Sequence, residues 1–379
     1  MKVAIIHDWL TVYAGAEKAL EQILVCFPSA DLFTMVDFLP SGDREFLLNR
    51  KITTSFIQRL PFAKKFYRNY LPLMPYAVEQ FDLSSYDIII SSSHAVAKGV
   101  ITGPDQIHIS YVHSPMRYAW DLQFHYLKES DLTNGLSSII TRYLLHRLRK
   151  WDALSANRVD VFLTNSSFVQ RRIQKCYRRK STVIFGPVAV QDFTLCDIKD
   201  DFYLAASRMV PYKKMDLIVN AFALMPDKKL VVIGDGPDLP KIQSAARGFP
   251  NISVVGYQSF DSLKSHMQRA KALVFAAEED LGLAPIEAQA CGTPVIAYGK
   301  GGVLDTVIEN VTGIFFNHQN IEDLCSAVAK FETMTFDYSF ISQHASNFSE
   351  ESFRNRFLDA INNSTEINNL SSTPLKESE

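Results

Sequence analysis

The sequence predicts an α/β protein made of two doubly wound domains, each with a parallel β-sheet. Short runs that are apolar at every position recur along the chain, and such runs are typical of strands buried on both faces. Helix-like stretches separate these runs, which indicates βα units and an open parallel sheet. The pattern stops once and then starts again. A chain of 379 residues, at about 100 to 200 residues per domain, also favours two domains.

The amino-terminal half carries the first series of strand-like runs. These strands are expected at residues 2–6, 87–90, 107–112, 161–163 and 182–184. A helix-like stretch from Ala16 to Phe27 follows the first of them. Together these elements predict an N-terminal Rossmann-like domain at residues 1–185.

The carboxy-terminal half repeats the design after a break. Residues 186–201 have no helical period and are interpreted as an interdomain linker. Strand-like runs then lie at residues 202–206, 229–233, 252–255, 272–276 and 294–298. They predict a C-terminal Rossmann-like domain at residues 202–345. A helix at 346–361 is expected to pack back on the N-terminal domain, and the polar residues 362–379 are expected to be disordered.

Composition excludes several classes of protein. Apolar residues make up 47% and charged residues 21% of the chain, which are ordinary values for a soluble globular protein with a substantial core. No apolar stretch approaches the roughly 18 to 20 residues of a membrane-spanning helix. The apolar run at the start of the chain is too short for a signal peptide. A cytoplasmic protein is therefore expected.

Cysteine and histidine spacing argues against a disulfide framework or a metal site. The five cysteines are scattered along the chain, which suits reduced, mostly buried thiols. The nine histidines include no H-x-x-x-H pair, and no Asp-x-Asp sequence occurs. Neither a metal nor a cofactor is expected.

The strongest candidate site follows the strand-like run that ends near Ala276. Glu279 and Glu287 lie on either side of a turn at Gly282, which places one acid on a loop and the other on a helix. Ligands of parallel sheets bind beyond the carboxyl ends of the strands, near helix N-termini. Ionised carboxylates accept hydrogen bonds and suit the neighbouring hydroxyls of a sugar or ribose. The alternative is a solvated acid pair at a helix start.

A turn with two cations follows the strand-like run at residues 202–206. Arg208 and Lys213 lie close to the carboxyl end of that strand. Fixed cations at this position would stabilise the negative charge that develops on a departing diphosphate. The alternative is a pair of surface cations ahead of a helix.

Two glycine-containing turns also follow predicted strands. Gly234 and Gly236 resemble the start of a dinucleotide-binding fingerprint, but the third glycine and the companion acid are missing. A close approach of this backbone to a ligand is still open. Gly301 and Gly302 begin another helix, where exposed backbone amides would suit a phosphate. A simple tight turn is the alternative at this second position.

These turns, in this order and spacing, resemble the family 4 retaining glycosyltransferases, which have the GT-B fold. The E-x7-E element at residues 279–287, with the following C-G-T-P, is specific, and the resemblance covers nearly the whole chain. Gly15-Ala16-Glu17 is similar to the family's G-G-x-E turn, and His113-Ser114-Pro115 resembles its H-x-P loop. The sequence YVHSPMRYAWD at 111–121, with YGKGG at 298–302, looks most like bacterial mannosyltransferases of O-antigen or exopolysaccharide synthesis.

The resemblance implies a GT-B protein whose two Rossmann-like domains face a central cleft. The implied roles are acceptor binding for the domain at 1–185 and nucleotide-sugar binding for the domain at 202–345. The implied catalytic residues are His113, Arg208, Lys213 and Glu279. The implied donor-binding residues are Gly15, Arg208, Lys213, Gly234, Gly236, Glu279, Gly282, Leu283 and Glu287. In these roles Glu279 holds hydroxyls of the donor sugar and Glu287 holds the ribose. Arg208 and Lys213 neutralise the diphosphate, and His113 contacts the sugar or the acceptor near the reacting carbon.

The implied activity is metal-independent transfer of a sugar with retention of the anomeric configuration. Mannose from GDP-mannose is the favoured donor, and the acceptor is a glycan, lipid-linked in the favoured case, in cell-surface polysaccharide synthesis. The alternatives are transfer from a UDP-sugar, a GT-B sugar-nucleotide epimerase, and a non-catalytic module that binds nucleotide sugars. Ala14 stands where the family has the first glycine of its G-G-x-E turn, and this departure favours the non-catalytic module.

Two basic amphipathic stretches predict contact with an anionic membrane. Residues 61–72 and 142–151 each place apolar side chains on one side of a helix and cations on the other. Each cation near an anionic lipid surface contributes about 1 kcal/mol, so peripheral docking at the inner face of the cell membrane is expected. The alternative is that the apolar faces are core. Nucleic acid is not expected as a partner, because the aromatic residues face away from the cations.

Overall fold

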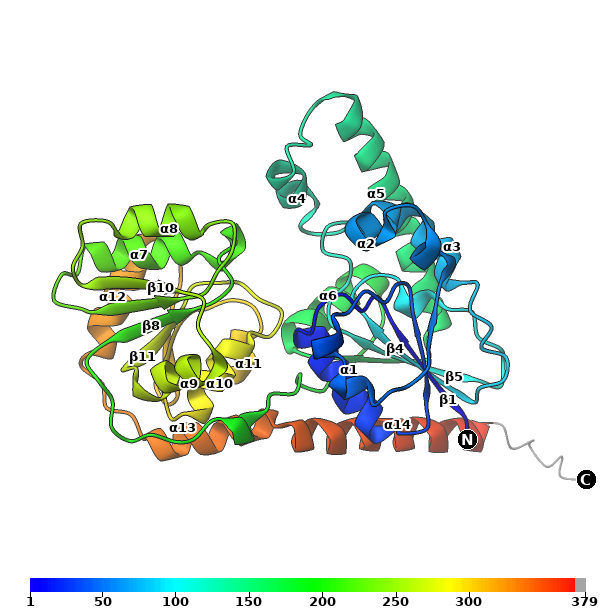
Figure 1. The fold of residues 1–379 in the computed structure, drawn as a ribbon. Coiled ribbons are helices and arrows are strands. Elements are labelled where there is room, and N and C mark those ends of the chain that lie inside the picture. Colours follow the sequence, from blue (N-terminus) through cyan, green and yellow to red (C-terminus); the bar gives the residue numbers. More distant parts are fainter. Residues whose placement is uncertain (372–379) are drawn as a thin grey trace, which may run out of the picture. The chain divides into compact units, whose positions relative to one another are not determined.

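The computed structural model describes residues 1–371, and these form two compact units (Figure 1). Unit 1 contains Met1–Gly186 together with the chain from Phe353 onward, and unit 2 contains Pro187–Ser352. Each unit is an α/β domain built around one parallel sheet. The predicted fold class of two doubly wound, Rossmann-like domains is therefore confirmed.

Unit 1 is built on a seven-stranded sheet. Its strands are β1 (Val3–His7), β2 (Asp31–Thr34), β3 (Ile52–Thr54), β4 (Ile88–Ser93), β5 (Ile107–Val112), β6 (Val161–Thr164) and β7 (Thr182–Val183). They pair in parallel in the order β3-β2-β1-β4-β5-β6-β7. Ala4 and Ile6 enter one core cluster while Val3 and Ile5 enter another. A strand covered on both faces has no polar side, which explains the continuous apolar run.

Helices cover this sheet on both faces (Figure 1). The helices of unit 1 are α1 (Gly15–Cys26), α2 (Ala63–Phe66), α3 (Met74–Val78), α4 (Gln123–Glu129), α5 (Gly135–Ser155), α6 (Ser167–Tyr177) and most of α14 (Glu350–Ser371). On α14, Phe353 and Phe357 are buried and meet the ring of Tyr111 on β5 edge-on, at centroid distances of 5.5 and 6.2 Å. The end of the chain thus completes the core around the first sheet.

Unit 2 repeats the architecture with six strands. These are β8 (Tyr203–Ala206), β9 (Leu230–Ile233), β10 (Ile252–Gly256), β11 (Ala272–Phe275), β12 (Val295–Tyr298) and β13 (Gly313–Phe316). They pair in parallel in the order β10-β9-β8-β11-β12-β13. The helices are α7 (Met215–Ala223), α8 (Leu239–Ala246), α9 (Phe260–Arg269), α10 (Leu283–Ala290), α11 (Val303–Thr306), α12 (Ile321–Phe331) and α13 (Tyr338–Ala345).

The strand order reverses once in each sheet, and this reversal sets where a ligand can bind. In unit 1 the chain leaves β1 toward β2 and β3, and it returns to the other side of β1 as β4. In unit 2 the same reversal separates β8 from β11. Ligands of open parallel sheets bind beyond the carboxyl ends of the strands at such a switch point.

The structure contains three short strands that the sequence analysis missed. Asp31–Thr34 and Ile52–Thr54 form β2 and β3, and Gly313–Phe316 forms β13. Two of them, β3 and β13, lie at sheet edges, and in β3 partial exposure weakens the apolar signal. Each has only three or four residues, so periodicity alone does not distinguish them from loops.

The boundaries between the units differ from the prediction in two places. Residues 187–201, interpreted as a linker, pack within unit 2, because Phe193 is buried with its ring 5.5 Å from that of Phe260. The tail expected to be disordered from residue 362 is helical through Ser371, as part of α14. Residues 372–379 of that prediction lie outside the described chain. No helix within residues 1–371 is both long and apolar enough to span a membrane.

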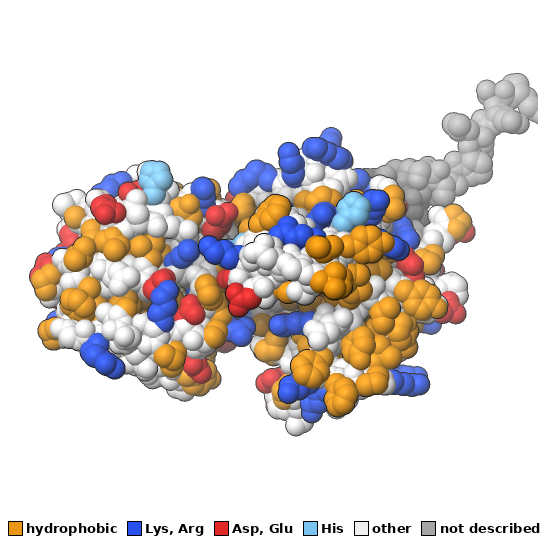
Figure 2. All heavy atoms as spheres, turned by 90° about the horizontal axis from the view of Figure 1, so that it is seen from above, with side chains coloured by type: hydrophobic (Ala, Val, Ile, Leu, Met, Phe, Trp, Pro, Cys, Tyr) orange, Lys and Arg blue, Asp and Glu red, His pale blue; other side chains and the backbone are white. Residues whose placement is uncertain are grey.

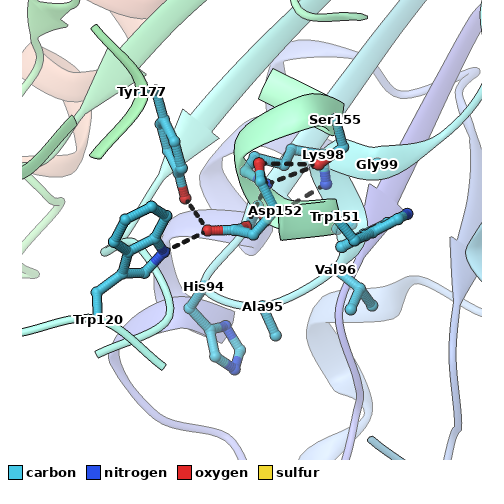
Figure 3. Close-up of polar contacts among 12 residues, drawn as sticks. His94, Ala95, Val96, Lys98, Gly99, Trp120, Trp151, Asp152, Ser155 and Tyr177 are labelled. Atoms are coloured by element: carbon cyan, nitrogen blue, oxygen red, sulfur yellow. Dashed lines mark hydrogen bonds and ion pairs between the residues drawn. The ribbon is translucent and has the colours of Figure 1, made fainter. Parts of the chain in front are cut away.

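A buried polar network ties four segments of unit 1 together (Figure 3). Lys98, just after β4, and Asp152 on α5 form an ion pair with side chains that are 1% and 0% exposed. The second carboxylate oxygen of Asp152 accepts hydrogen bonds from Trp120 Nε1 at 2.7 Å and from the Tyr177 hydroxyl at 2.9 Å. Lys98 also donates to Ser155 Oγ at 3.1 Å. Because every charge has partners, the network holds α5 and α6 against the loops after β4 and β5.

Candidate active site

Unit 2 contains a cavity of about 500 Å³ at the carboxyl ends of β8, β9 and β11. This is the switch point of its sheet. The cavity brings together most of the residues that the sequence analysis assigned to donor binding. Six of them line it: Arg208, Lys213, Gly234, Glu279, Leu283 and Glu287.

A cation and an acid from separate turns meet in this cavity. Lys213 donates from Nζ to Glu279 Oε1, and both side chains are largely buried, at 14% and 21% exposure. Lys213 ends the 3₁₀ turn after β8, and Glu279 lies on the loop between β11 and α10. Arg208 from the first turn also lines the cavity, and its side chain is exposed. The site therefore presents two cations that an anionic group could reach.

Helix α10 carries the rest of the lining on one face. Leu283 and Glu287 are four residues apart and both line the cavity, as expected for neighbours along a helix face. Gly282 precedes the helix with φ of 84°, and its Cα faces the Phe275 ring, where an added Cβ would lie 3.2 Å away. Glycine at this position lets the chain turn from the acid-bearing loop into α10.

At positions 234 and 236 a side chain would clash with the backbone of the neighbouring turn, so both positions require glycine. A Cβ at Gly234 would lie 1.9 Å from the Ser207 carbonyl oxygen, and one at Gly236 would lie 2.4 Å from that of Met209. These contacts press the turn after β9 against the turn that carries Arg208. Gly234 lines the cavity, whereas Gly236 lies outside its lining.

The tandem glycines support the acid-bearing loop. The Gly302 amide donates to the Glu279 carbonyl at 2.8 Å, and a Cβ on Gly301 would lie 2.4 Å from the same oxygen. The expectation that these amides are exposed for a phosphate is therefore wrong for Gly302. Its amide instead fixes the backbone that presents Glu279.

Three histidines gather at the carboxyl ends of adjacent strands in unit 1. His7 ends β1, His94 follows β4 and His113 follows β5. Ser92 lies between two of them, with its Oγ 3.1 Å from His7 Nδ1 and 2.8 Å from His113 Nε2. The ring of His94 lies 6.2 Å from that of His113. Only His113 of this group is among the predicted site residues.

Asp8 fixes the turn that carries His94. Its carboxylate is 0% exposed and accepts four backbone amides, from His94, Ala95, Val96 and Ala97, at 2.5 to 2.8 Å. The same carboxylate lies 3.1 Å from His94 Nδ1. Four charge-assisted hydrogen bonds satisfy the buried charge and hold this turn rigidly at the sheet's switch point.

Burial sets the protonation of the histidine cluster. Burial lowers the pKa of His113 well below its usual value, and the charges of His94 and His7 lower it further. The pKa of His94 is also lowered, again chiefly by burial. Burial tends to raise the pKa of Glu17, but its contacts with His7 and with backbone amides outweigh this and lower the pKa. His113 is therefore neutral near neutral pH and Glu17 is ionised.

Gly15 is the first residue of α1 and belongs to unit 1, as does His113. The amide of the preceding Ala14 donates to Glu17 Oε2 at 3.0 Å, which caps the helix start. Gly15 itself is exposed. The predicted roles of Gly15 and His113 toward a donor stay predictions.

Some lining residues escaped the sequence analysis. Tyr257 and Gln258 reach the cavity from the segment between β10 and α9, and Asp235 reaches it from the turn after β9. The sequence signal that could have identified these lining residues is their position, since each is a polar or aromatic residue just after a predicted strand. Among the residues whose side chains are described, no three His, Cys, Asp or Glu side chains are placed to hold a metal ion.

The part of the chain that contains this cavity matches a known protein family. Residues 194–352 match the family model of glycosyl transferases group 1. The matched glycosyl transferases group 1 region covers nearly all of unit 2, including the cavity and the Lys213–Glu279 pair. Unit 1 lies outside this match.

Curated relatives resemble part of the chain. An uncharacterized glycosyltransferase of Methanocaldococcus jannaschii is 27% identical over 168 residues, which cover 44% of this chain and 47% of that protein. A GDP-mannose-dependent α-(1-6)-phosphatidylinositol monomannoside mannosyltransferase of Mycolicibacterium smegmatis is 31% identical over 142 residues, or 32% of this chain and 36% of that protein. The matches therefore span less than half of these relatives.

Solved structures share the fold over almost the whole chain. The lipopolysaccharide outer core galactosyltransferase WaaB superposes with a TM-score of 0.67 at 17% identity, covering 95% of this chain and 99% of WaaB. HepE of Anabaena, in complex with UDP, superposes with a TM-score of 0.68 at 15% identity, covering 96% of this chain and 100% of HepE. At these identities the likeness concerns the fold, which is that of GT-B glycosyltransferases.

Proposed function

We propose that this protein is a glycosyltransferase that moves a sugar from a nucleoside diphosphate to an acceptor hydroxyl. The observation that carries the proposal is the cavity of unit 2, in which Arg208 and Lys213 lie with Glu279 and Glu287. Two cations suit a diphosphate, and two carboxylates suit the hydroxyls of the sugar and the ribose. The match of residues 194–352 to glycosyl transferases group 1 supports this assignment.

The proposed chemistry needs no metal, because the two cations neutralise the leaving group. The bond between the anomeric carbon and the diphosphate oxygen breaks, and a bond from that carbon to the acceptor oxygen forms. The acceptor proton passes to the departing phosphate oxygen on the same face of the sugar, so the anomeric configuration is retained. Fixed cations stabilise the charge that grows on the diphosphate as the bond breaks.

GDP-mannose is the proposed donor and a lipid-linked glycan is the proposed acceptor, in cell-surface polysaccharide synthesis. The Mycolicibacterium smegmatis relative is GDP-mannose-dependent and acts on a phosphatidylinositol mannoside, as its name states. A UDP-sugar is the second candidate donor, since HepE, a neighbour in fold, was solved with UDP and with UDP-glucose. The predicted role of Glu287 toward the ribose is common to both donors.

Release of nucleoside diphosphate from a panel of GDP- and UDP-sugars tests this proposal. We expect release from one donor, GDP-mannose first, with the same rate in the presence of EDTA. Absence of release and of binding with every donor would refute the proposal. Strict dependence on a divalent cation would refute the roles given to Arg208 and Lys213.

The same assay separates the alternative functions. An epimerase would change the donor sugar without any acceptor, which nuclear magnetic resonance of the donor pool would detect. A non-catalytic module would bind the donor tightly and leave it intact after long incubation.

We also propose that unit 1 docks on an anionic membrane, through a surface that differs in part from the one first expected. Of the two predicted stretches, residues 61–72 do expose Phe62 and Phe66, at 79% and 43%. Leu145 and Leu148 of α5 are buried in the core, so the expectation that the apolar face of 142–151 meets lipid is wrong. The other end of α5 and the neighbouring α4 instead expose large apolar side chains, at 51% to 73%: Phe124, Leu136, Ile139, Ile140 and Tyr143. We call these five residues the α4–α5 tip.

Cations accompany the α4–α5 tip. The guanidinium of Arg142 lies 5.6 Å from the centre of the Phe124 ring, and Arg147 Nη1 donates to the Tyr143 hydroxyl at 3.3 Å. On this face of unit 1, hydrophobic side chains and Lys or Arg side chains lie together (Figure 2). An exposed apolar patch beside cations suits the headgroup region of an anionic bilayer.

Co-sedimentation with vesicles tests the docking proposal. Leu136→Glu should reduce binding to vesicles containing phosphatidylglycerol at least about tenfold, because it places a negative charge in the patch. Leu224→Glu, at an equally exposed leucine of unit 2, is the matched control and should bind as the wild type does. Equal binding of both variants, or wild-type binding that is indifferent to salt and anionic lipid, would refute the proposal.

A further inference from the structure

Glu17, His7, Ser92 and His113 form a continuous chain of polar contacts at the carboxyl ends of three strands. The register of the sheet creates it, since His7 on β1 pairs directly with Ser92 on β4, and β5 beside β4 leads into His113. Glu17 reaches the chain from the first turn of α1. The side chains of His7 and Glu17 are 0% and 5% exposed, so water does not compete for these contacts.

One end of the chain is anchored by a fixed carboxylate. Glu17 Oε2 accepts the Ala14 amide at 3.0 Å. Glu17 Oε1 lies 3.5 Å from His7 Nε2, an electrostatic contact without the geometry of a hydrogen bond, and His7 Nε2 has no other partner among the described residues. An ionised carboxylate repels a lone pair and attracts an N–H. In the neutral form of His7, the single ring proton therefore lies on Nε2, and Nδ1 is left as an acceptor.

The hydroxyl of Ser92 lies between His7 and His113, so the tautomer of His7 determines the tautomer of His113. His7 Nδ1 lies 3.1 Å from Ser92 Oγ, so the hydroxyl donates its one proton there. Ser92 Oγ can then only accept from His113 Nε2, which is 2.8 Å away. His113 must consequently carry its proton on Nε2, and its Nδ1 is unprotonated.

The other nitrogen of His113 is open to a ligand. Among the described residues His113 Nδ1 makes no hydrogen bond, and it is absent from the buried polar atoms that lack a partner. This nitrogen is therefore not fully enclosed, and the His113 side chain is partly exposed. The ring is also held from its sides, by Tyr111 at 5.2 Å and His94 at 6.2 Å between centroids.

We propose that Glu17, His7 and Ser92 are positioning residues that hold His113 in the Nε2–H tautomer, so that its Nδ1 accepts a hydrogen bond from a hydroxyl of the ligand. A hydroxyl-rich ligand such as a sugar suits an acceptor of this kind, and this identity of the ligand rests on the proposed function. The tautomer itself depends only on the four side chains.

Nuclear magnetic resonance of the ¹⁵N-histidine-labelled protein at pH 8.5 tests the tautomer directly. This pH lies above the ordinary range of histidine pKa values. Long-range ¹H–¹⁵N correlations, assigned with His113→Gln, should show the proton on Nε2 of His113, protected from exchange with water. In Ser92→Ala this protected resonance should disappear, and Ser92→Thr, which keeps the hydroxyl, should restore it.

Ser110→Ala is the matched control. Ser110 is fully buried on β5 and its hydroxyl has no hydrogen-bond partner among the described residues. It should leave the His113 resonance unchanged, and thermal melting shows that each variant is folded. A proton on Nδ1 of His113 in the wild type, or an unchanged protected resonance in Ser92→Ala, would overturn the proposal.

A second experiment measures the turnover of the Ser92 variants and tests whether the tautomer of His113 matters for the reaction. With the donor found by the release assay, Ser92→Ala should lower kcat about tenfold, the worth of one well-placed hydrogen bond, while Ser92→Thr keeps most of it. A wild-type protein without any turnover would refute the proposed function and leave the tautomer result standing. Normal turnover in Ser92→Ala would overturn the positioning role.

Discussion

At the scale of single residues, the Lys213–Glu279 ion pair determines how the cavity of unit 2 can take a ligand. The two side chains form an ion pair in the cavity, at 14% and 21% exposure. A diphosphate would attract Lys213, and sugar hydroxyls would approach Glu279, so a nucleotide sugar offers each group a new partner. An anion without hydroxyls would bind Lys213 while lying close to the negative carboxylate of Glu279, which would repel it. This exchange of partners is consistent with the proposed ligand, which carries both a diphosphate and hydroxyls.

The sequence analysis found these two residues but could not show that they touch. Each follows the carboxyl end of a strand, and parallel strands bring such ends to one edge of the sheet. Contact also requires β8 and β11 to be neighbours, and the sequence shows no signal for that pairing. The same holds for His7 and Ser92, whose proximity depends on the register of β1 and β4.

At the scale of elements, α5 is held by its buried carboxylate rather than by its apolar face alone. Asp152→Ala should lower the free energy of unfolding by about 3 to 5 kcal/mol, because Lys98 would remain buried without a counter-charge. Urea denaturation measures this loss. Asp121→Ala, which removes a half-exposed partner of Arg172 in the same unit, is the control and should cost less than about 1 kcal/mol. Equal losses would contradict the role given to Asp152.

The amphipathic pattern of α5 also shows where sequence reasoning fails. Periodicity predicts that residues 142–151 form a helix with one apolar face, and the helix is present. It does not reveal whether core or lipid covers that face. In the structure Leu145 and Leu148 enter the core while Leu136 and Ile139, about two to three turns earlier, are exposed. Only the arrangement of the neighbouring helices decides between the two.

At the scale of the whole molecule, the two sheets share one strand order, with one additional edge strand in unit 1, and each unit carries a different group of polar side chains. Unit 2 carries the cations and acids of the cavity, and unit 1 carries the histidine cluster and the α4–α5 tip. Strand alternation along the sequence was enough to predict two such domains. The helix expected at residues 346–361 was predicted to pack back on the N-terminal domain, and Phe353, Phe357 and Ile361 of α14 lie in the core of unit 1. The cleft between the domains stays a prediction.

The central claim is that the cavity of unit 2 holds the diphosphate of a nucleotide sugar, and calorimetric titration of GDP and UDP tests it most directly. Lys213→Met should weaken binding of the preferred nucleotide by about 10- to 100-fold, the worth of a charge-assisted hydrogen bond. Lys214→Met removes the adjacent lysine, which does not line the cavity, and should bind within about twofold of the wild type. Equal affinity of the Lys213→Met variant and the wild type for both nucleotides would contradict the account.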